Sequence, residues 1–415
     1  MLYLILVCFS IPAFASFRYD AAHSSLLAAK TSGTIQIAAN EADEAASRIR
    51  EQLFYFVGPL NGYGAGADIV NAKITLLQVE RNQVKYSAEF LVAWPKGSSL
   101  PQKFRSVLPL STDDAGKKRF YAAYGTYCVS GEEPADSGSF FYYYRPEHQG
   151  CRILQTYDPS IAVGSSLDLK PALQQTSGKS PEYDQIWSDG RFVATLLVGT
   201  YADGTTSPTD QGVQNYDEVY RTLRQYFGNP SYINVPIGPQ ASPGLRYPDI
   251  EMVFQPDGVR TVNLNLLLIQ KYDLQHPSEK FLKRYQQRTE ISDFVAYNGH
   301  SGLGSNIRAL SKLGHFVEGQ YQIFFVNGCD TFSYVDSSLA NAHAAVNPGS
   351  AASKYFDLIT NAMPSPFQGF AQNALAMHRA IWEGRATYRD LLAGFSGTQR
   401  PIVSGEEDNN FPQPF

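Results

Sequence analysis

The stretch 291–330 constrains this chain more than any other, because two short apolar runs in it each end in a polar turn. The runs are residues 293–297 and 321–326, and each is followed by a turn that contains glycine. Between them, residues 306–313 carry apolar side chains at helical spacing. This succession of strand, turn, helix, strand and turn predicts a parallel βαβ unit. Both turns would then lie at the carboxyl ends of the strands, where open α/β sheets place their sites.

Each turn carries a side chain that can take part in chemistry. His300 follows the first strand and Cys329 follows the second, so we expect the two to lie side by side. A thiolate is a nucleophile, and a nearby imidazole lowers its pKa or carries its proton. The backbone N–H groups of Cys329 and of Ser301 or Gly302 are placed to face an oxyanion. The plainer alternative is that Cys329 is a buried core thiol and His300 a turn residue.

The same residues resemble a known clan of cysteine peptidases. A hydrophobic block ending in His-Gly, followed by a second block ending in Cys, is the pattern of caspases, legumains, gingipains, clostripain and separase. Here residues 294–297 precede His300 and residues 323–326 precede Cys329, and the Gly-Cys pair is similar to separase. The resemblance implies a caspase-like α/β domain, a mostly parallel sheet flanked by helices. It also implies a cysteine endopeptidase with a Cys-His dyad that acts on a peptide or protein substrate.

One position departs from the clan pattern. Ser301 follows His300 where the clan has glycine, and Gly302 comes one place later. Ser301 still offers an N–H to an oxyanion, but the change favours a second hypothesis. In that hypothesis the protein kept the caspase-like fold, lost the chemistry and serves in binding or surface interaction.

Three further residues are predicted to bind substrate. Asn327, two residues before Cys329, falls where several clan members have a residue beside the specificity pocket. Asp330 is the one acidic residue that flanks Cys329. Residues 191–200 are predicted to be a buried strand and residues 215–227 a helix, and Asp203 lies in the loop 201–214 between them, which is predicted to reach the same sheet edge.

A third hypothesis uses the same turn differently. Residues 299–303 resemble the G-x-S-x-G nucleophile elbow of α/β-hydrolases, which would make Ser301 the nucleophile of an esterase. Asp330 and His343 follow Ser301 in the order of acid and histidine that these enzymes use. The fifth position is Leu303 instead of glycine, and Asp330 follows on the very next strand.

The N-terminus and the cysteines predict export. Residues 2–12 are largely apolar and residues 13–15 fit the small-residue cleavage rule, so residues 1–15 are predicted to be a signal peptide. The protein would then be periplasmic or secreted, with no integral membrane segment after cleavage. In an oxidising compartment we expect Cys128 and Cys151, which are close in sequence, to form a disulfide. Cys329 would remain as the odd thiol.

Composition limits the partners. The net charge is −5 and no long basic run occurs, which argues against nucleic acid as the main partner. No Cys/His set has zinc spacing and no glycine-rich loop is suited to phosphate, so neither a metal nor a cofactor is predicted.

The pattern along the chain predicts two domains. Residues 16–169 are predicted to form an α+β domain with a strand at 33–38, a helix at 41–57, a hairpin at 72–92, a helix at 114–124 and a strand at 140–144. This order is of the ferredoxin-like kind and suits a pro-domain or an accessory binding module. Residues 170–184 are predicted to be a linker, residues 185–403 the caspase-like domain, and residues 404–415 a disordered tail.

Overall fold

The computed structural model describes residues 19–38, 43–80, 82–101, 103–130, 135–172, 178–351 and 353–411. The chain forms two compact units: the first contains the described residues from Ser24 to Ala172, and the second combines Tyr19–His23 with the described residues from Gly178 to Phe411. The predicted signal peptide lies outside the described residues. Within the described ranges, no helix has the length and apolar character that a membrane crossing requires.

The second unit is built on a nine-stranded sheet with the order β1-β15-β14-β13-β12-β8-β11-β10-β9. Its central strands run parallel, and antiparallel strands complete both edges. The predicted α/β fold with a mostly parallel sheet is therefore confirmed. The parallel strands are β11 (Thr261–Ile269), β8 (Arg191–Gly199), β12 (Phe294–Asn298), β13 (Gln322–Asn327) and β14 (Phe356–Asn361). The edge strands are β10 (Asp249–Phe254) and β9 (Tyr232–Ile233) on one side, and β15 (Pro401–Ser404) and β1 (Tyr19–Ala21) on the other.

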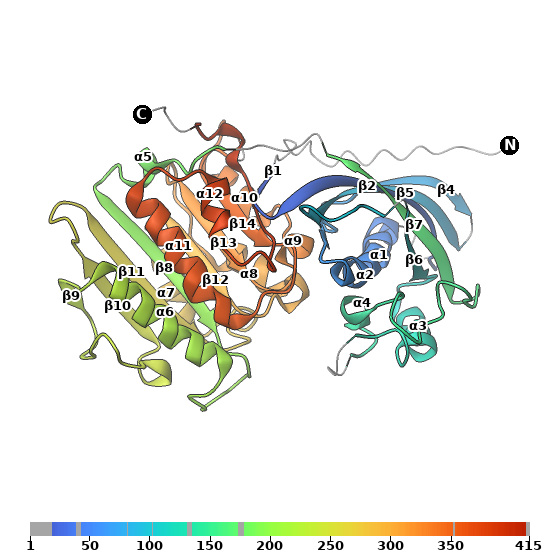
Figure 1. Ribbon diagram of the computed structural model, residues 1–415, viewed down its shortest axis with the longest axis horizontal. Helices are drawn as coiled ribbons and strands as arrows, with labels where there is room; N and C mark the ends of the chain where they lie inside the picture. The colour runs from blue at the N-terminus through green and yellow to red at the C-terminus, as the bar shows by residue number, and fades with distance from the viewer. Residues whose placement is uncertain are drawn as a thin grey trace. The chain divides into compact units, whose positions relative to one another are not determined.

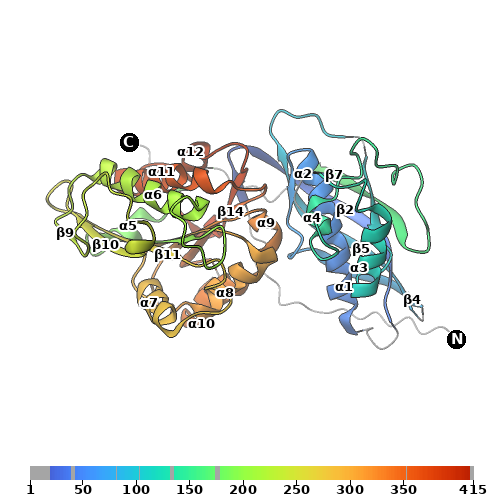
Figure 2. The same ribbon diagram turned by 90° about the horizontal axis from the view of Figure 1, so that it is seen from below.

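Helices cover both faces of this sheet, as Figure 2 shows. One layer contains α6 (Gln211–Phe227), α11 (Phe370–Glu383) and α12 (Tyr388–Ala393), and the other contains α7 (Glu279–Thr289), α8 (Ser305–Leu313) and α10 (Ser338–Val346). Because both faces are covered, β8, β12 and β13 are continuous apolar runs that do not alternate with polar residues. Short helical turns complete the unit: α5 (Tyr183–Ile186), η3 (Gly244–Arg246), η4 (Gly302–Gly304), α9 (Thr331–Tyr334), η5 (Phe367–Gly369) and η6 (Glu406–Asp408).

The first unit is a curled antiparallel sheet packed on helices, visible in Figure 1. The path β3-β5-β2-β7-β6 runs through the sheet, and β4 pairs with β5. The strands are β2 (Ser24–Gln36), β3 (Gly66–Ala67), β4 (Lys73–Glu80), β5 (Gln83–Pro95), β6 (Phe104–Pro109) and β7 (Ala162–Pro171). The helices are α1 (Ala45–Leu53), η2 (Phe54–Phe56), α2 (Val57–Gly62), α3 (Asp114–Tyr124) and α4 (Phe140–Tyr143).

The predicted strand at 140–144 is wrong, because residues 140–143 form α4 and Tyr144 makes only an isolated bridge with Val129. Phe140 and Tyr144 are fully buried and their rings pack against those of Tyr55 and Phe120. Aromatic residues favour strands by propensity, but burial in this cluster decides the local structure. The Cys128–Cys151 disulfide is confirmed, with Cα atoms 4.8 Å apart.

Both ends of the described chain are ordered where they join the second sheet. Tyr19–Ala21 pairs with β15, so the described chain begins in the second unit and enters the first at Ser24. The predicted disordered tail is wrong for residues 404–411, because Ser404 ends β15 and Asn409 is buried. Residues 412–415 lie outside the described residues. The predicted linker, 170–184, contains the end of β7 and the start of α5, and its residues 173–177 are also not described.

Candidate active site

His300 and Cys329 follow neighbouring parallel strands at one edge of the second sheet. Asn298 at the end of β12 is in register with Asn327 at the end of β13. One step further, the N–H of Gly299 donates to the carbonyl of Asn327 over 3.3 Å. The turn that carries His300 and the turn that carries Cys329 are therefore in direct contact, as the βαβ pattern predicts.

Gly328 lets these two turns approach each other closely. A Cβ atom built on Gly328 would lie 3.0 Å from the carbonyl oxygen of Gly299 and 3.4 Å from the backbone nitrogen of Ser301. Contacts this short force neighbouring atoms to move, so any side chain at this position would separate the turns. The same contact places the backbone nitrogen of Ser301 beside the turn that leads to Cys329.

The ring of His300 is held by the loop after β8. Its Nε2 lies 3.0 Å from the carbonyl oxygen of Tyr201, and a carbonyl can only accept a hydrogen bond. Nε2 therefore carries the proton, and Nδ1 of the neutral imidazole is left as the acceptor. The rings of Tyr201 and Phe367 flank the imidazole, with centroids at 5.2 Å and 5.3 Å.

Burial sets the charge of this imidazole. It lowers the pKa of His300 below its ordinary value, and the nearby Lys271 acts in the same direction. The bond to the Tyr201 carbonyl and the charge of Asp210 oppose this shift without reversing it. The neutral form, which can accept a proton at Nδ1, therefore predominates at neutral pH.

Cys329 is partly exposed and forms no disulfide with another cysteine of the described residues. Its Sγ lies 3.8 Å from the carbonyl oxygen of Ser365, in the loop that follows β14. Phe367, two residues further along this loop, contacts the ring of His300. One loop therefore borders both candidate catalytic side chains.

The two turns contain unusual backbone conformations. Leu303, in the turn after His300, has a φ of 51°, and Asp330, next to Cys329, has a φ of 50°. Arg400 is the third residue other than glycine with positive φ in the described ranges. Left-handed conformations are uncommon for leucine and arginine, less so for aspartate, and they are concentrated at functional sites.

A chain of buried amides runs beneath the two turns. The amide nitrogen of Asn327 donates to Asn298 over 2.7 Å, and the amide nitrogen of Asn298 donates to Asn215 on α6 over 3.0 Å. The amide oxygen of Asn327 accepts from Asn361 over 2.6 Å and from the hydroxyl of Ser365 over 2.7 Å. Asn327 therefore links Ser365, which contacts Cys329, to β12, the strand that precedes His300.

The predicted substrate-binding residues differ in exposure. Asn327 and Asp330 are buried, at 1% and 0% exposure, so their side chains do not face solvent in this structure. Asp203 is exposed in the loop after β8. Burial, and to a smaller extent the charge of Asp203, raises the pKa of Asp273. The sequence analysis missed Tyr201, Ser365 and Phe367. The position of Tyr201 directly after a predicted parallel strand was the available signal.

The histidine of the esterase hypothesis lies at the other end of β13. His343 is buried, with Nδ1 at 2.9 Å from the Leu339 carbonyl and Nε2 at 2.9 Å from the side-chain oxygen of Gln322. Gln322 is the first residue of β13, whereas Ser301 touches the turn beyond its last residue. The geometry therefore does not bring His343 to Ser301.

Within the described residues, no group of three or more His, Cys, Asp or Glu side chains is arranged to hold a metal ion. No model of a known family, no curated protein and no solved structure matches this chain.

Proposed function

We propose that the second unit is a caspase-like cysteine peptidase in which Cys329 is the nucleophile and His300 carries the proton. The observation that carries the proposal is the tether of His300 Nε2 to the Tyr201 carbonyl, beside the turn of Cys329. Because Nε2 donates its proton to this carbonyl, Nδ1 is the ring nitrogen that can accept a proton in the reaction. A parallel sheet flanked by helices, with these residues after neighbouring strands, supports the caspase-like assignment.

The proposed reaction proceeds in two stages. Nδ1 of His300 takes the thiol proton, and the Cys329 thiolate attacks the scissile carbonyl carbon. The oxyanion is stabilised by backbone N–H groups of the turns, including that of Ser301. Nδ1 returns the proton to the leaving amine as the C–N bond breaks, which leaves a thioester. Water, deprotonated by His300, then hydrolyses the thioester and regenerates the thiol.

The test is labelling of the full chain with a thiol-directed peptidyl probe. We expect labelling of the wild type and its loss in Cys329→Ala. In His300→Ala we expect a decrease of about 10²-fold or more, since general-base assistance contributes that much. His315→Ala, which removes an exposed histidine from the same unit, is the matched control and should label normally.

Ser301 favours one alternative, a binding protein that retains the fold without the chemistry. Absence of labelling in a chain with an intact fold would support that alternative. Labelling of Ser301 by a fluorophosphonate would instead support an esterase. If the thiol probe does label Cys329, a library of peptide substrates would then define the residue preferred before the cleaved bond.

The setting of the proposed enzyme is outside the cytoplasm. The Cys128–Cys151 disulfide supports this, because such bonds persist in oxidising compartments.

A further inference from the structure

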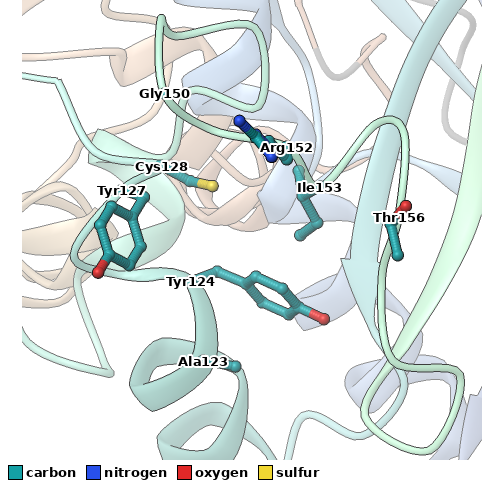
Figure 3. A pocket seen from close by; sticks show the side chains of 8 residues that line it. All are labelled: Ala123, Tyr124, Tyr127, Cys128, Gly150, Arg152, Ile153 and Thr156. Atoms are coloured by element: carbon teal, nitrogen blue, oxygen red, sulfur yellow. The ribbon is translucent and has the colours of Figure 1, made fainter.

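Two cavities lie along one segment of the first unit, residues 150–157. The Cys128–Cys151 disulfide fixes the start of this segment. The first cavity has a volume of about 270 Å³, and Figure 3 shows the ring of Tyr124 opposite Arg152 and Ile153, with Tyr127 to one side. The second has a volume of about 310 Å³ and is lined by Lys103, Arg105, Tyr157 and the serines 32, 106, 165 and 166, among others. We call the two together the basic face.

Three cations line the two cavities, and exposed Asp168 follows at the end of the β6–β7 pairing, next to Leu167. Lys103, Arg105 and Arg152 are exposed, and none forms an ion pair with a carboxylate in the described part of the chain. No Asp or Glu lines either cavity. The nearby Asp158 directs its carboxylate to the backbone and hydroxyl of Ser160. In a chain with a net charge of −5, this local excess of positive charge indicates an anionic ligand.

The basic face also exposes aromatic rings. Tyr127 is 64% exposed and Tyr157 is 37% exposed, and each lines one of the cavities. Gly164 on β7 allows Tyr157 to lie against the strand, because a Cβ there would be 2.9 Å from the tyrosine hydroxyl. A tyrosine ring offers an apolar face and a polar tip, which suits the C–H face and the hydroxyls of a sugar ring.

Serine hydroxyls complete the lining. Ser32, Ser165 and Ser166 line the second cavity, and each hydroxyl can both donate and accept a hydrogen bond. Arg105 is in register with Ser166 on the neighbouring strand, so a cation and a hydroxyl lie next to each other. This pairing suits a ligand that carries an acidic group and several hydroxyls on one ring.

We propose that the basic face binds an acidic oligosaccharide, a chain that contains uronic acid units. Lys103, Arg105 and Arg152 would pair with its carboxylates, the serines would bind its hydroxyls, and Tyr127 and Tyr157 would stack on its rings. The acidic balance of the whole chain disfavours long nucleic acids. This inference uses only the first unit and is independent of the peptidase proposal.

The test measures binding of tetragalacturonate to the full chain by calorimetry, with maltotetraose as the neutral sugar and poly-L-glutamate as the acidic peptide. We expect binding of tetragalacturonate alone. K103A/R105A should weaken it about fivefold or more, because it removes two cations that pair with the ligand. The control K118A/R119A removes one lysine and one arginine from the exposed side of α3. We expect it to leave the affinity for tetragalacturonate unchanged. Near-UV circular dichroism would verify that each variant is folded.

A second pair of variants tests stacking. Tyr157→Ala should weaken binding about threefold or more, and Tyr157→Phe, which keeps the ring, should retain most of it. The proposal is overturned if tetragalacturonate does not bind, or if K103A/R105A behaves like K118A/R119A. Equal binding of poly-L-glutamate with no effect of Tyr157→Ala would also overturn it and would assign the face to acidic peptides.

Discussion

The Nε2 atom of His300 lies 3.0 Å from the carbonyl oxygen of Tyr201, which precedes it by 99 residues. This bond joins the loop after β8 to the loop after β12 at the carboxyl edge of the sheet. It fixes which ring nitrogen holds the proton in the neutral imidazole. The partner of Nε2 is a backbone atom, so the conformation of the loop maintains the hydrogen bond. The side chain at position 201 affects this hydrogen bond only through the loop conformation.

The first prediction concerns the charge on His300. If its neutral form is the base, the acid limb of the rate of probe labelling should lie below the ordinary histidine pKa. Lys271 lowers the pKa of His300, so Lys271→Ala should move this limb to higher pH, on the order of a few tenths of a unit for a partly exposed charge. Lys271→Arg keeps the charge and should leave the profile unchanged. The measurement is the labelling rate between pH 4 and 8, and a downward shift in Lys271→Ala would contradict the assignment.

The second prediction concerns the buried amide chain. Asn327→Leu leaves Asn298, Asn361 and Ser365 without their partner, so it should lower the free energy of unfolding by about 2–4 kcal/mol. It should also slow labelling of Cys329, because Asn327 holds the loop of Ser365. The measurements are denaturant unfolding and the labelling rate at neutral pH.

The control for this variant is Gln322→Leu, at the amino end of the same strand. Gln322 is equally buried and donates to the carbonyls of Thr289 and Ser292. Its loss should destabilise the unit to a similar degree and leave the labelling rate of the folded protein unchanged. Equal slowing in both variants would show that Asn327 acts through general stability alone.

The third prediction concerns the pH dependence of stability. Glu406 and Asp357 are fully buried beside each other and near Asp20. Burial first, and then the neighbouring carboxylates, raises the pKa of Glu406 to about 9, and burial raises the pKa of Asp357 to about 7. Both groups hold protons in the folded state that the unfolded state releases at lower pH, so stability falls as pH rises through these values.

The clearest window lies between pH 6.5 and about 9. Below pH 6.5 two buried histidines have the opposite effect on stability. Burial lowers the pKa of His343 and of His378 to about 4, so each becomes charged only on unfolding, and stability rises with pH in that range. Glu406→Gln should flatten the decline and stabilise the protein at pH 8.5, by on the order of 1 kcal/mol or more. Thermal unfolding from pH 6.5 to 9 measures this. An unchanged slope would mean that Glu406 is ionised in the folded protein.

The fourth prediction concerns the disulfide. It closes a loop with a sequence separation of 23 residues, so Cys128→Ala combined with Cys151→Ala should destabilise the first unit by about 3 kcal/mol. Cys329→Ala, a single cysteine change in the second unit, should leave the first unit unaffected. Hydrogen exchange of residues in α3 and β7 reports on the first unit directly. Equal protection in the double variant and the wild type would contradict this prediction.

The sequence determined the local elements and the side chains that topology brings together. Apolar periodicity predicts β8, α6, β12 and β13, because burial on one helix face or both sheet faces leaves a local pattern. The parallel βαβ order then brings His300 and Cys329 to one edge, and their closeness in sequence pairs Cys128 with Cys151. Each of these inferences uses residues near each other in the chain or a general rule of sheet connection.

Only the tertiary structure decided the contacts between distant segments. The Tyr201 tether, the amide chain through Asn327 and the ordered residues 404–411 depend on partners far away in sequence. The segment 140–143 is helical because an aromatic cluster buries it, against its strand propensity. Such contacts leave no periodic signal, since packing and hydrogen bonding select them only after the sheets have assembled.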